Sequence, residues 1–301
     1  MPLKSQLHVD VLLSNVSVKY SNPEYIADRV FPIVPVKHDT NKYRVYTRNF
    51  KMPKTQRNSK AAAYEFDFEV STASYMLQEH ALKNYVGDDD ADNYDLASLK
   101  EDTTEQLTDA LMRRRELTIA QLFTKTSWSL NVSLASGAEF TANTTTSNPI
   151  PVFDTAATTI IANGGAKPNF GILPRAGFVG CKNHVSVLDR TKYTSAEMTV
   201  NMLAALFDLG ELLVPMSNQD TAPVGIADSL GTIWDENAFV GHKPSSPGPL
   251  QASSGYIFRK NIPAVRTWRD EERKATAVEV QYKEDIKVVA SLSGYLICNI
   301  S

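Results

Sequence analysis

The sequence predicts an α+β fold, and three observations lead to that class. Residues 102–127 contain no Gly or Pro and follow the pattern of one long amphipathic helix. Residues 64–70 and 278–283 alternate strictly between apolar and polar side chains, which is typical of half-buried strands. No segment of 20–50 residues recurs along the 301 residues, so the chain is not a repeat array.

The composition is that of a globular protein without a strong charge bias. Hydrophobic residues make up 43% and charged residues 22%, the net charge is −3, and the pI is about 6.0. These values lack the basic footprint of a dedicated DNA-binding protein. No apolar stretch is long enough for a signal peptide or a membrane span, which predicts synthesis in the cytoplasm and no membrane partner. Cys181 and Cys298 are too few for a disulfide framework and are expected to be buried small side chains.

The N-terminal part of the chain predicts segments that need support from elsewhere. Residues 1–22 have no clear periodicity, as expected of an arm that is ordered only against a neighbour. Residues 25–36 are strongly apolar, and Pro32 and Pro35 predict an extended segment rather than a helix. Such a segment must be covered by another element.

A long hairpin follows, with strands expected at 42–50 and 64–70. Its linker, residues 51–60, has no acidic residue and carries four basic ones: Lys51, Lys54, Arg57 and Lys60. A two-stranded ribbon is marginally stable alone in water, so this one would be steadier on another surface, and an acidic surface would suit its tip. An ordinary solvated hairpin remains an equal alternative on these residues alone.

The predicted long helix is roughly 38 Å in length if its about 25 residues each rise about 1.5 Å. Asp102 with Glu105, or Thr103 with Gln106, is expected to form a capping box at its start. Arg114 and Arg115 interrupt the apolar side, so part of that side should meet polar surface. Two interpretations stay open: an amphipathic helix on a sheet with solvated arginines, or a central helix that carries contacts between subunits.

The second half is expected to alternate short helices with strands and then to close with strands. The predicted helices are 154–162, capped by Asp154, then 183–190, then 196–209, capped by Ser195. The predicted strands are 177–181, 212–215, 278–283, 286–290 and 294–300, with a turn near Asp285.

No motif in the chain indicates catalysis, a cofactor or a metal. Phosphate loops, dinucleotide fingerprints, nucleophile elbows and zinc-ligand spacings are absent. An acidic cluster at Asp88, Asp89, Asp90 and Asp92 fails as a calcium loop, because Asn93 stands where Gly is needed and Leu99 where Glu is needed. The cluster is better interpreted as a solvated turn or as a group awaiting a basic partner. The sequence therefore predicts no catalytic, metal-binding or cofactor-binding residue, and no enzyme.

Several segments, taken in their order, resemble a known family. They are IADRVFPIVPV, the basic-tipped hairpin, EQLTDALMRRRELTIAQLF, NGGAKPN, GFVGCKNHVSVL, SAEMTVNMLAALFDLGELLVP, GTIWDENAFVGH and VQYKEDIKVVASLSGYLICN. This arrangement resembles the major capsid proteins of tailed bacteriophages, which share the Hong Kong 97-type fold. The resemblance covers nearly the whole chain and rests on order and spacing rather than on any single signature.

The resemblance implies four parts. These are an N-terminal arm and extended segment (1–40), an extended loop (41–80), a peripheral domain with the spine helix (81–171 and 256–301), and an axial domain (172–255). It implies assembly as hexamers and pentamers into the icosahedral head of a phage, around double-stranded DNA that is not read by sequence. The implied subunit-interface residues are Arg48, Lys51, Lys54, Arg57, Lys60, Glu65, Asp67, Arg113, Arg114 and Arg115.

The implied partners are other copies of the chain, scaffold and portal proteins, and in some relatives a decoration protein. The implied location is the virion, after synthesis in the host cytoplasm. Two alternatives remain at this stage. One is an encapsulin-like compartment shell on the same fold, and the other is a soluble metal-dependent enzyme that uses the Asp88 cluster.

Overall fold

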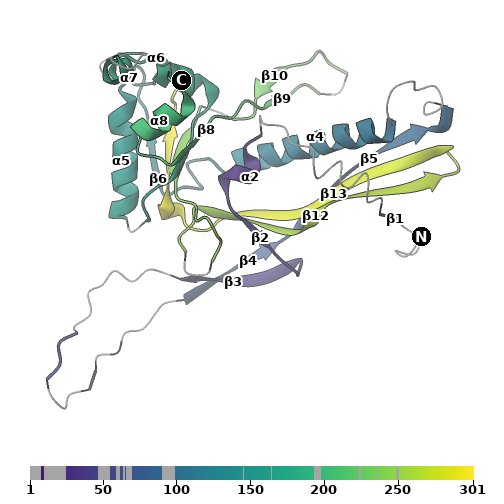
Figure 1. Ribbon diagram of the computed structural model, residues 1–301, viewed down its shortest axis with the longest axis horizontal. Coiled ribbons are helices and arrows are strands. Elements are labelled where there is room, and N and C mark those ends of the chain that lie inside the picture. The colour runs from purple at the N-terminus through teal and green to yellow at the C-terminus, as the bar shows by residue number, and fades with distance from the viewer. Residues whose placement is uncertain are drawn as a thin grey trace.

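The computed structural model describes residues 8–9, 25–46, 55–58, 62–63, 65, 70–89, 99–144, 146–163, 165–192, 198–223, 225–234, 236–248 and 251–301. Figure 1 shows an elongated molecule with a group of helices at one end. A long helix runs beside long strands toward the other end, and a two-stranded ribbon projects from the body. The mixture of helices and strands agrees with the predicted α+β class.

The longest strands form one sheet. Its order is β1 (His8–Val9), β12 (Gly255–Asp270), β13 (Ala275–Val288) and β5 (Gln78–Gly87), and β2 (Ile33–Pro35) joins β12 in parallel. The turn predicted near Asp285 is wrong, because β13 runs through it with Asp285 opposite Phe258. The strands β5 and β12 were missed by the sequence patterns. In β5 nearly all side chains up to Lys83 and Asn84 are exposed, so no apolar alternation marks it.

The long helix α4 spans Leu99–Ala120, so it begins and ends earlier than the predicted 102–127. The predicted capping box lies inside its first turns, where Thr103 Oγ1 donates to the Leu99 carbonyl at 2.7 Å. After Ala120 the chain tightens, with Phe123 N donating to the Ala120 carbonyl at 3.0 Å. Phe123 turns inward against Trp128, which donates from Nε1 to the Leu122 carbonyl at 3.1 Å. These aromatic contacts end the helix.

The α4 helix covers the sheet through a narrow apolar strip. Leu111, with Leu99 and Leu107 beside it, packs on valines of β12 and β13. Leu99, Leu107 and Leu111 are eight and four residues apart, close to two turns and one turn, so they lie on one side of the helix.

The apolar segment near the N-terminus differs from its prediction. It contains a short helix, α2 (Ala27–Val30), which ends before Pro32 and leads into β2. The proline prevents continuation but leaves the preceding turn free to be helical. As predicted, the segment is covered: Ile26, Val30 and Phe31 are buried in a cluster with the end of α4.

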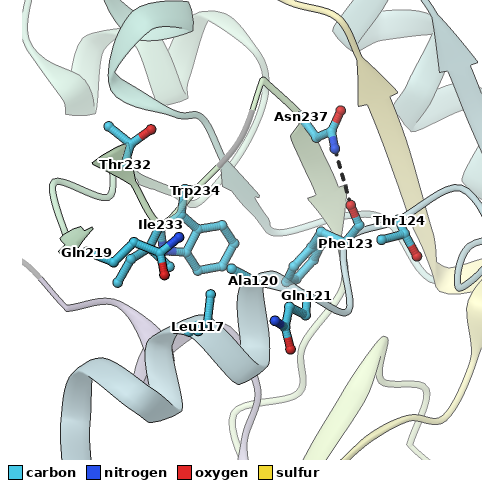
Figure 2. Close-up of a pocket in the computed structure, with 10 residues that line it drawn as sticks. All are labelled: Leu117, Ala120, Gln121, Phe123, Thr124, Gln219, Thr232, Ile233, Trp234 and Asn237. Atoms are coloured by element: carbon cyan, nitrogen blue, oxygen red, sulfur yellow. Dashed lines mark hydrogen bonds between the residues drawn. The ribbon is translucent and has the colours of Figure 1, made fainter. Parts of the chain in front are cut away.

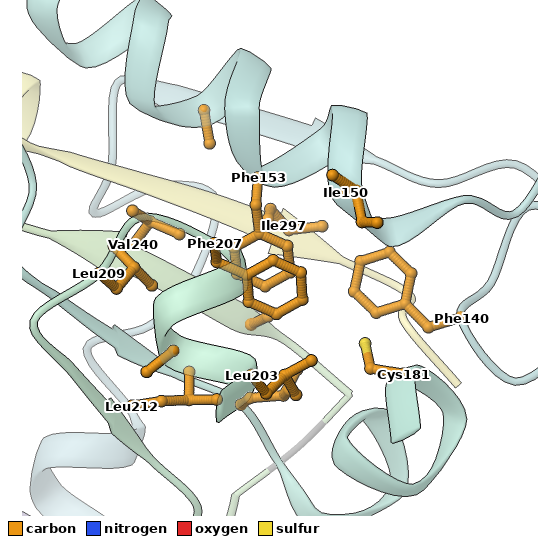
Figure 3. Close-up of a cluster of buried hydrophobic side chains, with 14 of the residues drawn as sticks. Phe140, Ile150, Phe153, Cys181, Leu203, Phe207, Leu209, Leu212, Val240 and Ile297 are labelled. Carbon is orange, nitrogen blue, oxygen red and sulfur yellow. The ribbon is translucent and has the colours of Figure 1, made fainter. Parts of the chain in front are cut away.

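The second sheet has the order β6 (Leu130–Ser133), β14 (Gly294–Cys298), β11 (Ala238–Gly241), β7 (Phe170–Ile172) and β8 (Glu211–Leu213). Four helices accompany it: α5 (Pro149–Ala162), α6 (Arg175–Asn183), α7 (Val185–Thr191) and α8 (Val200–Leu206). Their shared core contains the parallel ring pair Phe153–Phe207, with centroids 3.9 Å apart, and Cys181 at its edge (Figure 3). Both cysteines are buried and unpaired, as predicted. The predicted domain boundary at residue 172 falls inside β7.

Three local predictions in this half are corrected. The α5 helix begins at Pro149 with Asn148 as its cap, and Asp154 lies within it. The segment 177–181 is part of α6 and not a strand; an apolar run this short fits either element. Thr199, rather than Ser195, caps α8, and residues 193–197 lie outside the described residues.

Two further pairs of strands form small sheets of their own. The ribbon consists of β3 (Thr40–Tyr46) and β4 (Val70–Met76), in register from Thr40 opposite Met76 to Tyr46 opposite Val70. The second pair, β9 (Asn218–Asp220) and β10 (Leu230–Thr232), forms a hairpin next to the end of α4. A short 3₁₀ turn, η2 (Ser291–Ser293), precedes β14.

Candidate assembly surfaces

The root of the β3–β4 ribbon is fastened to the first sheet by aromatic rings. Tyr75, which is 6% exposed, stacks on Phe258 of β12 with centroids 4.7 Å apart and planes 13° apart. Tyr43 of β3 lies against the same ring at 5.1 Å. The backbone N–H of Met76 donates to Asp285 Oδ2 at 2.9 Å. The root is therefore held by both packing and polar contacts.

In the described residues, one face of the ribbon is open to solvent, whereas Tyr43, Val45 and Ala73 on the other face are half-buried. In β3 the side chains of Lys42 and Arg44 are exposed, and in β4 so are those of Thr72 and Ser74. Figure 1 shows the ribbon extending away from both sheets. A two-stranded ribbon that leaves one face uncovered is only marginally stable by itself in water. The described part of the ribbon is thus an extension that a surface from another molecule would stabilise.

Most of the predicted basic tip lies outside the described residues, which exclude Arg48, Lys51, Lys54, Lys60 and Asp67. Arg57 and Glu65 are described, and both are exposed. Their assignment to a subunit interface stays a prediction.

The three consecutive arginines of α4 have different surroundings. Arg115 is 4% exposed, and its Nε donates to Glu284 Oε1 at 2.8 Å. Its guanidinium also lies 4.5 Å from the ring centroid of Tyr282. A buried side chain offers no surface to another subunit, so the interface role predicted for Arg115 is not supported by its position. Arg115 is buried because it pairs with Glu284 of β13, so the side of α4 that faces the sheet is polar at this point.

Arg115 belongs to a network of two arginines and two carboxylates. Arg259 Nη2 donates to Asp28 Oδ1 at 2.6 Å and to Glu284 Oε2 at 3.1 Å, and Arg115 Nη1 reaches Asp28 at 3.4 Å. Burial tends to raise the pKa of Asp28, but the charges of Arg115 and Arg259 outweigh it and lower that pKa below 3.8. The network ties α2, α4, β12 and β13 together.

Glu116, the next residue of α4, is fully buried and connects two further segments to the helix. Its carboxylate accepts hydrogen bonds from the backbone N–H groups of Ile26 and Ala27, at 3.1 and 2.8 Å, and from Trp234 Nε1 at 2.6 Å. Burial raises the pKa of this carboxyl, and the donated hydrogen bonds offset part of that rise. Glu116 therefore fixes the start of α2 and the base of the β9–β10 hairpin to α4. No local pattern indicates this role, because Ala27 and Trp234 lie 89 and 118 residues away from Glu116 along the chain.

Arg113 and Arg114 reach the surface. Arg113 Nη2 donates to Asp109 Oδ2 at 2.7 Å, and the hydroxyl of Tyr25 donates to Asp109 at 2.9 Å. Arg114 is exposed. Of the predicted arginine group, these two remain available for an interface.

A cavity of about 290 Å³ lies between the end of α4 and the base of the β9–β10 hairpin (Figure 2). Its walls combine apolar side chains with uncharged polar ones: Leu117, Ala120, Gln121, Phe123, Thr124, Gln219, Thr232, Ile233, Trp234 and Asn237. None of these side chains is a carboxylate, an imidazole or a thiol.

The acidic cluster is engaged within the chain where it is described. Both oxygens of Asp88 are bonded by the guanidinium of Arg269, with Nη2 at 2.6 Å from Oδ2. Asp90 and Asp92 lie outside the described residues. In the described part of the chain, no three His, Cys, Asp or Glu side chains are placed to hold a metal ion. Across the same residues, no helix has the length and apolarity needed to cross a membrane.

Comparison with known proteins connects this architecture to viral shells. No family model matches the chain. It is 25% identical over 307 residues to the major capsid protein of Burkholderia phage BcepMu, covering 97% of each chain. It is 26% identical over 241 residues to the major capsid protein of Pseudomonas phage JBD67, covering 76% of this chain and 75% of that one.

Solved structures give the same result for the fold. A phage-related protein from Bordetella bronchiseptica RB50 is 26% identical with a TM-score of 0.78, and 98% of each chain is covered. The capsid of cyanophage P-SCSP1u has a TM-score of 0.61 at 10% identity, covering 89% of this chain and 86% of that one. A virus-like particle from Pyrococcus furiosus has a TM-score of 0.59 at 11% identity, with 95% of each covered.

The class that emerges is a capsid fold. The chain has the fold of phage capsid proteins, and its predicted resemblance to phage major capsid proteins is confirmed over nearly its whole length.

Proposed function

We propose that the chain is a major capsid protein that self-assembles as hexamers and pentamers into the icosahedral head of a tailed double-stranded DNA phage. The observation that carries the proposal is the likeness over 97% of both chains to a phage major capsid protein, joined to a ribbon with one exposed face in the described residues.

Different parts of the chain are suited to different contacts within such a shell. In such a subunit, residues 1–40 form an arm, 41–80 an extended loop that reaches a neighbour, 81–171 with 256–301 a peripheral domain, and 172–255 an axial domain. A rigid body with projecting elements suits a subunit that must form several interfaces, each of which buries on the order of 1,600 Å² in total.

The partners in this proposal are other copies of the chain, a scaffold protein and a portal protein, with a decoration protein as an additional binder of the outer surface. The shell encloses DNA through weak, sequence-independent contacts, which fits a net charge of −3. The protein is made in the host cytoplasm and ends in the virion.

Electron microscopy of the purified chain, alone and with the scaffold protein from the same phage, tests this function. Closed shells of uniform size are the expected result. A chain that remains a monomer or a small oligomer under both conditions contradicts the proposal.

The ribbon's part in assembly is tested by reversing its charge with K51E/K54E/R57E. We expect the triple variant to lose shell formation and to keep the urea midpoint of the unassembled subunit, because the tip would meet an acidic neighbour with the wrong sign. The matched control K51R/K54R/R57K keeps every charge and should assemble normally. Normal shells from the reversed variant would remove electrostatics from the explanation.

An encapsulin-like compartment is the alternative on the same fold. Particles isolated from phage-producing cells distinguish the two, because a phage head contains double-stranded DNA and a compartment contains protein cargo. A metal-dependent enzyme is less well supported, since Asp88 is already bonded by Arg269.

A further inference from the structure

The β9–β10 hairpin presents an unusual surface for its size. It carries Ile226 and Leu230, whose side chains are 65% and 76% exposed and are the most exposed large hydrophobics among the described residues. Between residues 218 and 232 the charged residues are Asp220 and Asp228, with no Lys or Arg. The hairpin therefore combines apolar side chains with negative charge.

The hairpin holds its shape by its own bonds. Asp220 Oδ1 accepts hydrogen bonds from the backbone N–H groups of Ala222 and Ser229, each at 2.9 Å, and Thr221 N donates to the Ser229 carbonyl at 3.0 Å. Burial is minor at Asp220, and these backbone donors lower its pKa, so it stays charged. A preformed tip loses little conformational entropy when it binds.

A surface of the opposite charge lies on α6 and α7. Val179, Val185 and Leu188 are 40%, 56% and 48% exposed there. Between residues 175 and 192, Asp189 is the one acidic residue in the sequence, against four basic ones: Arg175, Lys182, Arg190 and Lys192. Exposed apolar side chains framed by positive charge suit a partner that is apolar and acidic.

Within one molecule the β9–β10 hairpin extends away from the α6–α7 surface. Figure 1 places α6 and α7 on one side of the helical end, while the β9–β10 hairpin projects on the opposite side, toward the long strands. A contact between them must therefore join two copies. Because the two surfaces differ, the contact is head-to-tail, and a repeated head-to-tail contact closes into a ring when its rotation allows.

We propose that the β9–β10 hairpin of one copy docks on the α6–α7 surface of the next copy around each ring. This inference rests on the proposed function and names the contact that would close a hexamer or a pentamer. The chain itself supplies an occupant that matches the α6–α7 surface in both charge and apolarity.

Cross-linking of assembled particles tests the contact. Cysteines are placed at the centre of each surface in I226C/L188C, and a short bis-maleimide is added to intact shells. The native thiols should stay silent, because Cys181 and Cys298 are buried and burial raises the pKa of both. We expect the monomer band to be lost to a ladder that ends at the pentamer and the hexamer.

The matched control is I226C/I161C. Ile161 is 52% exposed, but it lies at the last turn of α5, whereas the first turn of α5 lies near α7 through the hydrogen bond between Ser186 and Asn148. The control chain should remain monomeric under the same treatment. A mixture of the separate I226C and L188C chains should give a cross-linked dimer that neither chain gives alone.

The outcomes separate the two proposals. Intact shells that give no ladder from I226C/L188C and no dimer from the mixture overturn this contact and leave the capsid function standing. The absence of shells from the unmodified chain overturns both.

Discussion

The junction around α4, which is the network of Asp28, Arg115, Arg259 and Glu284, differs from the β3–β4 ribbon in how its charged residues are placed. At the junction, Arg115 and Glu284 are each 4% exposed, and their charges are matched inside the chain. On the ribbon, Lys42 and Arg44 lie on the face that is exposed in the described residues. The charges of the junction are paired within a single molecule, whereas the ribbon keeps an exposed face that another molecule can cover.

This difference indicates where assembly acts. Charges that are satisfied internally fix the relative positions of α2, α4, β12 and β13, so the body can be rigid before it meets a neighbour. In the described residues, the ribbon is held at its root by Tyr75 and its aromatic partners and by the hydrogen bond from Met76 to Asp285. Variants of the two regions should therefore separate folding from assembly.

The largest effect is expected from Arg115→Leu. Removing the guanidinium leaves the carboxylate of Glu284 buried with one partner fewer, and breaking a buried ion pair from one side costs about 3–5 kcal/mol of unfolding free energy. Urea denaturation of the unassembled subunit measures this loss.

Arg114→Leu is the matched control, since it makes the same change one residue away on the exposed side of the helix. We expect its free energy of unfolding to stay within about 0.5 kcal/mol of the parent value. Equal losses of unfolding free energy in Arg115→Leu and Arg114→Leu would contradict the comparison, because the buried ion pairs of Arg115 would then contribute no more than an exposed arginine does.

An intermediate and local effect is expected from Tyr75→Ala at the ribbon root. The substitution removes the ring stacked on Phe258, and we expect the opening free energy of β3 and β4 to fall by about 1–3 kcal/mol, less than for a central core aromatic. Hydrogen exchange should speed up in these two strands and stay unchanged in β13.

Ser74→Ala, at an exposed position of the same strand, should leave exchange unaltered. Faster exchange throughout the molecule in Tyr75→Ala would show that the ribbon is part of the cooperative core, which would contradict the separation drawn above.

The elements with a regular apolar pattern along the chain could be predicted from the sequence. The α+β class, the existence of α4 and the strand at 278–283 all follow from spacing along the chain. The ends of α4 could not be predicted in this way, because they depend on Phe123 turning inward to Trp128, Trp234 and Phe239. The length and apolarity of the run 177–181 fit a strand and a helix equally well, so its pattern does not distinguish the two.

The assembly surfaces were only partly accessible to the same reasoning. Of the two arginines expected on the apolar side of α4, Arg115 lies there and meets the polar side chain of Glu284, whereas Arg114 is exposed. The partner lies 169 residues away, so no local pattern could name it or show that Arg115 is buried. The hairpin at 218–232 gave no periodic signal, and its significance comes from exposure that only the fold reveals.

The smallest effect is expected from Asp28→Asn, which tests how much the half-exposed ion pairs of Asp28 contribute to the free energy of unfolding. The Asp28 side chain is 49% exposed, so we expect its ion pairs to contribute at most about 1 kcal/mol near neutral pH. Burial raises the pKa of Asp28, but Arg115 and Arg259 lower it further, so its folded pKa lies below the unfolded value of 3.8. The stability that the charged group adds is therefore present above 3.8 and is lost as the pH falls through the folded pKa. Urea midpoints of the parent and the variant should differ near neutral pH and converge in acid, and a difference that grew on acidification would mean that Asp28 is destabilised by its charge.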